Sequence, residues 1–295
     1  MQSKRSILDL LIDEILFKIL SGMRMRAAKK GMFRKSLIVP ISDLIGQRII
    51  STGRYEATQF DALSEILNSP RCEKEFGINL NGMFIDIGAN IGLYTIALSS
   101  FFQKTLSLEA SPTTYEILKL NVGLTGASNV LPLCLGASNQ MRSATIYTPE
   151  GNLGWAKIGT DFTDERSSQE IRLDTLDNIV SSHELGDLPI GLVKIDVEGH
   201  ELQVLEGASR ILSEKRPTVL YEALDGEAAR VCSRILRDNG YTHYYAFKRR
   251  LSLSGLARGF PIEFIQIDPN DTGRNTLICA VNNGATESRA AFAAS

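Results

Sequence analysis

The stretch M-F-I-D-I-G-A-N-I-G-L-Y-T, residues Met83–Thr95, decides the fold of this chain. An apolar run with a single acid, Asp86, ends in a turn with two glycines, Gly88 and Gly92, and residues typical of a helix follow at once. This order predicts a strand, a glycine turn and a helix, which form a nucleotide-type pocket at the carboxyl end of a parallel strand. Because a short glycine turn is a weak signal alone, the flanking sequence must support the interpretation.

Several later strands are also expected to end in acids. Apolar runs that end in Glu109, Asp196 and Glu222 alternate with helical segments along the chain. This alternation predicts an α/β fold with a mostly parallel, doubly wound sheet. Ligands bind at the carboxyl ends of the strands in such sheets, so we expect these acids to surround one site.

Local patterns place the remaining elements. The segment 149–170 is polar, contains glycines and the only tryptophan, Trp155, and is predicted to be a long loop. Ser111 and Pro112 suit the start of a helix, and Gly240 suits the end of one. We expect strands at 36–41, 48–51, 105–109, 129–135, 143–147, 188–196, 217–222, 241–247 and 275–281, and helices at 57–67, 112–122, 199–212 and 225–239.

Composition and charge argue against several classes of protein. Apolar residues make up 43% and charged residues 22% of the 295 residues, which is ordinary for a soluble globular protein. The net charge of −2 gives no reason to expect a nucleic-acid partner. The four cysteines and three histidines show neither zinc-binding spacing nor a disulfide framework, so we expect reduced cysteines in a cytoplasmic protein.

The N-terminal part carries a different charge from the rest. Residues 6–20 place apolar side chains on one helical face, and a basic run follows through residue 35. Such a segment could rest as a peripheral contact on the inner membrane surface, or pack on the main domain or on a second copy of the chain in a homo-oligomer. The chain shows no apolar run long enough to span a membrane and no signal-peptide pattern. We expect three regions: an amphipathic helix, basic linker and cover at 1–52, the main domain at 53–282, and a disordered tail at 283–295.

The turn discriminates between nucleotide ligands. Glu109 follows Gly92 by 17 residues, a spacing that suits an acid accepting hydrogen bonds from ribose hydroxyls. The dinucleotide fingerprint requires its second glycine where this chain has Asn90, and the turn has no Lys or Arg to meet a phosphate. The missing G-K-[ST] excludes P-loop chemistry. A phosphate-free nucleoside that carries its own carboxylate and ammonium groups, as S-adenosylmethionine does, fits the turn better.

Over residues 53–224 the chain resembles the FkbM-type S-adenosylmethionine-dependent methyltransferases. K-I-D-V-E-G-x-E-L is the most specific shared motif, and the order and spacing of the motifs agree throughout. The resemblance runs through G-R-Y-E at 53–56, I-D-I-G-A-N-I-G-L-Y-T at 85–95, E-A-S-P at 109–112, the region of Asn121, T-L-D at 175–177, L-V-K-I-D-V-E-G-H-E-L-Q-V-L-E-G-A-S-R-I-L at 192–212, R-P at 216–217 and Y-E at 221–222.

The resemblance implies a class I methyltransferase fold, a Rossmann-like sheet of about seven strands with the last strand antiparallel. It also implies methylation of a hydroxyl on a sugar or a polyketide-type natural product. Where the family tends to have Ser-Asp-Gly after the third strand, this chain has Asn139, whose amide can still meet the adenine edge. The cofactor contacts carry over to Asp86, Gly88, Asn90 and Gly92 at the methionine moiety and to Glu109 at the ribose.

The acids at the later strand ends are candidates for the chemistry. A hydroxyl acceptor benefits from a general base, typically by about 10²–10⁴-fold. We hypothesise that Asp196 orients or deprotonates the acceptor, while Glu222 and Glu198 shape the site. His200 is the alternative base because the pKa of histidine is naturally near neutral, or it is an exposed residue at the start of a helix.

Other roles for these residues stay open. Asp196, Glu198 and Glu222 could instead hold Mg²⁺, a hard cation that prefers oxygen ligands, and Glu198 could instead cap the following helix. Lys194 could partly neutralise the acids, and Trp155 could stack on a sugar ring or anchor its loop. We place Lys194 and Trp155 among the substrate-binding residues, and Tyr55 and Glu56 could face the cofactor from the N-terminal cover.

The sequence therefore predicts an S-adenosylmethionine-dependent O-methyltransferase, of EC 2.1.1 type, acting on a hydroxyl of a glycan or a small natural product. A nicotinamide-dependent oxidoreductase on a Rossmann-like fold is a second interpretation, which Asn90 argues against. A methyltransferase-like interaction module without catalysis is a third, which the intact Asp86, Glu109 and Asp196 argue against.

Overall fold

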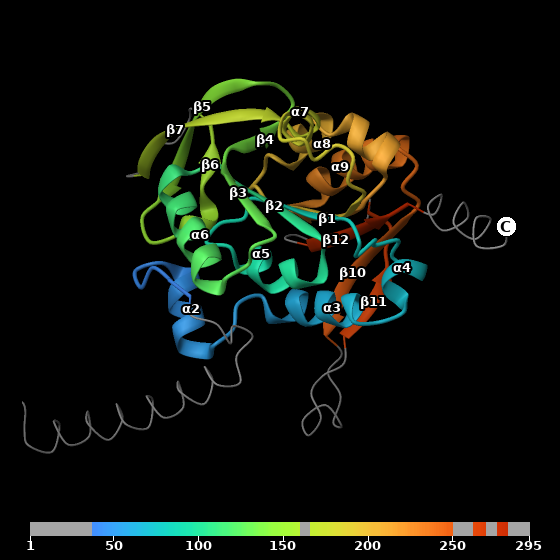
Figure 1. The fold of residues 1–295 in the computed structure, drawn as a ribbon, viewed down its shortest axis with the longest axis horizontal. Coiled ribbons are helices and arrows are strands. Elements are labelled where there is room, and N and C mark those ends of the chain that lie inside the picture. Colours follow the sequence, from blue (N-terminus) through green and yellow to red (C-terminus); the bar gives the residue numbers. More distant parts are fainter. Residues whose placement is uncertain (1–36, 160–165, 250–261, 270–275, 283–295) are drawn as a thin grey trace, which may run out of the picture.

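The structure, a computed structural model, describes residues 37–159, 166–249, 262–269 and 276–282 (Figure 1). The expected N-terminal amphipathic helix, its basic run and the tail at 283–295 lie outside the described residues. Within the described part, no helix combines the length and the apolar character needed to cross a bilayer.

A mixed sheet of eight strands forms the centre of the described structure, in the order β11-β10-β12-β9-β8-β1-β2-β3. The five strands from β9 to β3 pair in parallel, whereas β12 pairs antiparallel with β9 and β10, and β10 pairs antiparallel with β11. The strands are β1 (Met83–Ile87), β2 (Lys104–Glu109), β3 (Val130–Cys134), β8 (Ile190–Ile195), β9 (Thr218–Ala223), β10 (His243–Arg249), β11 (Ile262–Gln266) and β12 (Thr276–Val281).

Helices cover both faces of this sheet, which is why its central strands are apolar throughout (Figure 1). On β1, Met83, Ile85 and Ile87 pack on one side, and Phe84 packs on the other. The first side carries α7 (Leu176–Ser182), α8 (Glu201–Glu206) and α9 (Gly226–Asp238), and the second carries α3 (Ala57–Leu67), α4 (Arg71–Lys74) and α5 (Leu93–Leu98). The helix α6 (Pro112–Thr125) packs on β2 and β3.

Side chains alternate between the two faces along a strand, so Asp86 and Lys194 both lie on the face of the sheet that α3, α4 and α5 cover. They are register partners on β1 and β8, so the pleat places an acid and a lysine side by side beneath the glycine turn. This pairing is the first structural link between the two sequence motifs.

The described sheet has one strand more than the expected seven, so two strands rather than one run against the parallel set. The extra strand is β11, a five-residue strand that pairs with β10 and that the sequence prediction missed. Its Phe264 packs edge-on against Phe76 and Phe247, at centroid distances of 5.5 and 5.6 Å. The other central strands and the helices at 57–67, 112–122 and 225–239 are confirmed to within a few residues.

A second sheet replaces much of the loop predicted at 149–170. Its strands are β4 (Gly136–Ser138), β5 (Arg142–Pro149), β6 (Lys157–Ile158) and β7 (Arg166–Thr175), in the order β4-β7-β5-β6. The strand predicted at 143–147 is confirmed as β5, whereas β7 buries only a few side chains, among them Ile171 and Leu173, and is too polar to suggest a strand. The loop prediction is therefore wrong for β6 and β7, and Gly151–Ala156 keeps an irregular path around the short turn η2 (Leu153–Trp155).

The strand predicted at 48–51 is wrong, because these residues lie in the helix α2 (Leu44–Thr52). The carboxylate of Asp43 accepts hydrogen bonds from the Ile45 and Gly46 amides, and Gly53 ends the helix at φ +69°. These caps outweigh the strand preference of the β-branched residues. Residues 37–40 form no strand either; Ile38 instead exchanges two hydrogen bonds with the Asn121 side chain, at 2.6 and 3.0 Å.

The helix predicted at 199–212 is shorter than expected. The helix α8 ends at Glu206, and a separate π-helical turn, η3 (Ile211–Lys215), follows. Gly207 separates the two because its Cα approaches the backbone of Ser138, where a Cβ would lie 1.9 Å from the Ser138 oxygen. This close approach joins α8 to the start of the second sheet.

Candidate active site

The turn after β1 is shaped by close backbone contacts. Gly88 has φ +75°, and a Cβ there would lie 1.8 Å from the Asp196 carbonyl oxygen. The Gly88 and Ala89 amides both donate to the Leu108 carbonyl, at 3.0 and 2.9 Å. The turn therefore brings the carboxyl ends of β1, β2 and β8 together, as the predicted binding mode requires.

Asn90 occupies the left-handed region at φ +51°, and its amide donates to Glu109 Oε2 at 2.9 Å. The other oxygen of Glu109 accepts from the Ser111 amide at 2.8 Å. Burial raises the pKa of Glu109 to about 7, although both amides favour the charged form. The acid predicted for a ribose is thus fixed against the turn by the backbone, at the end of β2.

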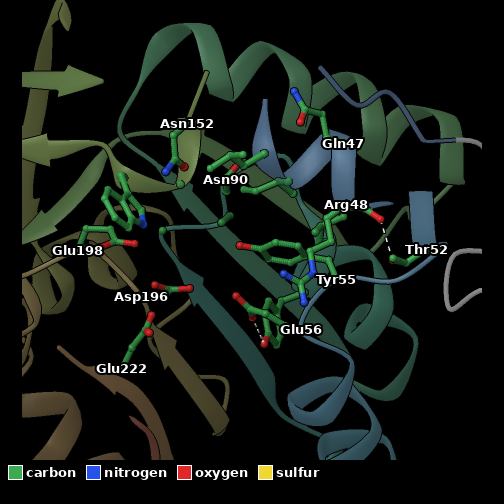
Figure 2. Close-up of a pocket in the computed structure, with 18 of the residues that line it drawn as sticks. Gln47, Arg48, Thr52, Tyr55, Glu56, Asn90, Asn152, Asp196, Glu198 and Glu222 are labelled. Carbon is green, nitrogen blue, oxygen red and sulfur yellow. Dashed lines mark hydrogen bonds between the residues drawn. The ribbon is translucent and has the colours of Figure 1, made fainter. Parts of the chain in front are cut away.

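Two cavities meet at this turn. The smaller, of about 70 Å³, lies between the end of β2 and the second sheet, and its lining includes Glu109, Ala137 and His200. The larger, of about 1050 Å³, is lined by α2, by Tyr55 and Glu56, by the turn after β1, and by Trp155 (Figure 2). Both are lined by Gly88, Asn90, Gly154, Asp196 and Glu198.

Lys194 links the carboxylates beneath the turn. Its Nζ lies 3.0 Å from Asp196 Oδ2, 3.6 Å from Asp86 Oδ1 and 4.5 Å from the centroid of the Tyr94 ring. Burial opposes the ammonium charge, but Asp196 and Asp86 outweigh it and raise the pKa of Lys194. Lys194 is buried, bound to two carboxylates and part of the lining of the larger cavity, so it organises the acids of the site, and its contact with a substrate stays a prediction.

Asp86 lies behind the turn. It is fully buried, accepts a hydrogen bond of 2.6 Å from Thr95 Oγ1, and lines neither cavity. Gly92 likewise lines neither; it begins α5 at φ +91°, where a Cβ would lie 2.7 Å from Leu118 Cδ1. Both residues lie behind the turn that lines the cavities, and the cofactor contacts that the family resemblance implied for them stay predictions.

Asp196, Glu198 and Glu222 come together as expected at the ends of β8 and β9. Each offers a carboxylate oxygen, and the three oxygens lie within 4.8 Å of one another (Figure 2). Burial, followed by the charge of Asp196, raises the pKa of Glu222 to about 8 and that of Glu198 to about 7. Glu198 does not cap the next helix, because α8 has no side-chain cap; its first residue, Glu201, instead accepts hydrogen bonds from the Val197 and Gly199 amides of the preceding loop.

Glu56 is a fourth carboxylate in the larger cavity, and the sequence pointed to it only through G-R-Y-E. It sits just before α3 in the left-handed region, at φ +43°, and accepts a hydrogen bond of 2.6 Å from Tyr94 Oη. The Tyr94 ring stacks on Phe60 with centroids 4.1 Å apart. Burial and then Asp196 raise the pKa of Glu56. The strained backbone and the hydrogen bond hold this carboxylate toward the cavity.

Two predicted residues lie away from their expected places. Asn139 is exposed, donates to Glu206 Oε2 at 2.9 Å, and lines neither cavity, so its adenine contact stays a prediction. His200 is 9% exposed and bonds Ser138 Oγ at 2.9 Å, and burial followed by Arg142 lowers its pKa. It lines only the smaller cavity and is neither exposed nor placed to serve as a base in the larger one.

The five parallel strands continued by an antiparallel partner of β9, with helices on both faces, define the class I methyltransferase fold. The chain belongs to the FkbM methyltransferase family: the family model described as "Methyltransferase FkbM domain" matches residues 86–246. The resemblance seen in the sequence is thereby confirmed.

The chain is also similar to two proteins named as methyltransferases and to a solved structure. The chain is 28% identical over 191 residues to "Methyltransferase sdnD" of Sordaria araneosa, covering 55% of this chain and 74% of that protein. It is 31% identical over 129 residues to "Hexuronic acid methyltransferase AglP" of Haloferax volcanii, covering 43% of this chain and 50% of that protein. The crystal structure of an FkbM methyltransferase from Methylobacillus flagellatus aligns over 87% of this chain and 58% of that chain, with 16% identity and a TM-score of 0.43.

Proposed function

We propose that this protein transfers the methyl group of S-adenosylmethionine to a hydroxyl oxygen of a sugar-type acceptor. The observation that carries the proposal is the junction of the two cavities at Gly88, Asn90 and Asp196. The nucleoside would occupy the smaller cavity with its ribose at Glu109, and the methionine moiety would follow the turn past Asn90. The sulfonium then lies at the junction, with its methyl group facing the larger cavity and its carboxylates.

The residues around the smaller cavity support this cofactor over a dinucleotide. Among the described residues, the lining of the smaller cavity has no Lys or Arg to meet a pyrophosphate. It does offer the Glu109 carboxylate, which can accept hydrogen bonds from ribose hydroxyls. A dinucleotide would leave its phosphates without a cation, whereas an adenosyl sulfonium needs none.

The reaction itself is an in-line displacement. The acceptor oxygen attacks the methyl carbon, a carbon–oxygen bond forms as the carbon–sulfur bond breaks, and neutral S-adenosylhomocysteine leaves. Alignment of oxygen, carbon and sulfur can supply roughly 7–11 kcal/mol of the barrier. The hydroxyl proton passes to a carboxylate of the larger cavity.

Asp196 is the best placed of the carboxylates for this proton. It lines both cavities, so it stands at the junction, and its ion pair with Lys194 fixes the side chain at 3.0 Å. Glu222 and Glu198 have raised pKa values and therefore carry protons more readily near neutral pH. They suit hydrogen bonding to the neighbouring hydroxyls of the acceptor.

A sugar acceptor fits the polar end of the larger cavity. Its carboxylates can bind several hydroxyl groups, and Trp155 offers a ring for stacking. Arg48 of α2 also lines the cavity and has no carboxylate partner among the described residues. Because AglP is named as a hexuronic acid methyltransferase, we infer that Arg48 would bind the carboxylate of a uronic acid acceptor.

Asp196, Glu198 and Glu222 also fit the oxygen preference of Mg²⁺, as a second role for the same cluster. Bound there, the ion would orient acceptor hydroxyls and stabilise the alkoxide. Full turnover after exhaustive EDTA treatment assigns the cluster to base chemistry, and a loss that Mg²⁺ restores assigns it to the metal.

Titration calorimetry with S-adenosylhomocysteine and with NAD tests the proposal. We expect S-adenosylhomocysteine to bind with one site per chain, NAD not to bind, and a Glu109→Gln variant to bind S-adenosylhomocysteine more weakly. Binding of NAD in place of S-adenosylhomocysteine would support the oxidoreductase, and binding of neither would support the interaction module.

A further inference from the structure

Large apolar side chains gather at the mouth of the larger cavity. Nine such side chains are exposed in the described part of the chain, and four of them line this one cavity: Ile41, Leu44, Ile50 and Trp155. Ile41 is 76% exposed and Leu44 is 57% exposed. Scattered exposed apolar residues are ordinary, but a group that surrounds a cavity mouth indicates a binding surface.

Hydrogen bonds between distant segments hold the mouth of the larger cavity in place. The Leu44 amide at the start of α2 donates to the Gly151 carbonyl at 3.0 Å, and the Leu153 amide donates to Asp43 Oδ2 at 2.6 Å. These two bonds tie α2 to the segment that carries Trp155. Ile45 of α2 is buried in the core, whereas Leu44 at the start of the helix and Ile41 in the turn before it stay exposed.

The same cavity runs from this apolar mouth to a polar end. The carboxylates of Asp196 and Glu222 line it together with Ile41 and Leu44, so one ligand can touch both ends. Figure 2 shows Arg48 of α2 directed toward Tyr55 and Glu56, between the helix and the carboxylates. A hydroxyl-rich head suits the polar end, and an apolar chain suits the mouth.

We propose that the methyl acceptor is amphiphilic: a sugar head that reaches Asp196, joined to an apolar chain that lies on Ile41, Leu44 and Trp155. This inference rests on the proposed function, because it assigns the larger cavity to the acceptor. A second copy of the chain is another possible occupant of this apolar surface. Held there permanently, it would obstruct the acceptor's route to Asp196, whereas the acceptor's own chain would not.

Alkyl glycosides of increasing chain length test this inference. The probes are methyl, butyl and octyl β-D-glucoside, titrated calorimetrically below the micelle concentration into the full chain loaded with S-adenosylhomocysteine. Burial of one methylene corresponds to roughly a fourfold gain in affinity. We expect the octyl glucoside to bind at least about tenfold more tightly than the methyl glucoside, because only part of the chain contacts the mouth.

Substitutions distinguish binding of the alkyl chain at the cavity mouth from nonspecific binding to other exposed apolar residues. The double substitution Ile41→Gln with Leu44→Gln should reduce the octyl advantage to about twofold. The matched control is Leu124→Gln, at an exposed leucine of α6 that does not line the cavity, and it should keep the full advantage. All four side chains of interest, Ile41, Leu44, Trp155 and Leu124, are exposed, so these polar substitutions should not unfold the protein.

Equal affinity for methyl and octyl glucoside, or no detectable binding of either, would overturn the inference. So would an octyl advantage that the double variant retains. Affinity for S-adenosylhomocysteine is measured in the same proteins; if it is intact while the chain-length effect is absent, the inference fails and the donor site stands.

Discussion

Substitution of Asp196 by Asn removes the proposed base while it keeps the shape of the side chain. The amide oxygen of Asn can still accept a hydrogen bond from Lys194, so the site geometry should survive. We expect kcat to fall by about 10²–10⁴-fold, the usual contribution of a general base. The affinity for S-adenosylhomocysteine should stay within about twofold, because the backbone of this region and not the Asp196 carboxylate shapes the turn.

The same substitution has a predictable effect on stability. Removing one partner of a fully buried ion pair costs roughly 3–5 kcal/mol. Here Lys194 keeps Asp86 at 3.6 Å, and the Asp196 side chain is 24% exposed, so the free energy of unfolding should fall by only about 1–3 kcal/mol. The variant therefore folds at room temperature, and its kinetic defect can be measured on native protein.

The assay is a single-turnover measurement at saturating S-adenosylmethionine, with methylated product quantified by mass spectrometry against the best sugar acceptor. Asp187→Asn provides the matched control, because Asp187 is exposed and lines neither cavity. Turnover of the Asp196→Asn variant within about threefold of the parent, with cofactor affinity unchanged, would refute the base role.

Three further predictions follow from the site. Glu109 has a pKa of about 7 in the folded protein, and ribose hydroxyls favour its charged form. The Kd for S-adenosylhomocysteine should therefore be constant above pH 7 and should rise by up to about tenfold per pH unit below it. Calorimetry across pH checks this prediction, and the same pH dependence in the Glu109→Gln variant would refute it. His200→Asn should weaken cofactor binding and leave kcat at saturating cofactor nearly unchanged, whereas Asn139→Ala should change neither quantity. A loss of kcat in the His200→Asn variant would instead support His200 as the base. Arg48→Gln should raise KM for a hexuronate acceptor by about tenfold or more, since a hydrogen bond to a charged group contributes about 1.5–3 kcal/mol. The same variant should leave KM for the matching neutral hexose unchanged. Equal effects on both sugars would argue against binding of a carboxylate at Arg48.

The sequence predicts that the acids at the strand ends come together, because local rules govern their placement. Glu109 and Asp196 end apolar strands, and parallel topology brings such ends to one edge. Strand alternation also explains why Asp86 and Lys194 meet, since both lie on the same face of adjacent strands. The acidic cluster follows from the same two rules applied to β8 and β9.

The acceptor side could not be predicted, because it depends on contacts between distant segments. The second sheet exposes most of its polar side chains, so β7 looks like a loop until its pairing with β5 is known. The helix α2 is held at the cavity by contacts with a distant segment, such as the hydrogen bond of Asp43 with Leu153, a residue 110 positions away. The place of His200 depends on the approach of Gly207 to Ser138, which no local pattern indicates.

The most direct test of the central claim uses S-adenosylmethionine with a trideuterated methyl group. The purified protein is incubated with this donor and a panel of neutral, uronic acid and alkyl-linked sugars, and the products are analysed by mass spectrometry and NMR. We predict that one class of sugar gains one trideuteriomethyl group on an oxygen, with an equal amount of S-adenosylhomocysteine formed, and that Asp196→Asn suppresses the transfer. Label found on nitrogen or carbon, or a protein that binds no S-adenosylhomocysteine, would contradict the assignment of this fold and site to O-methylation.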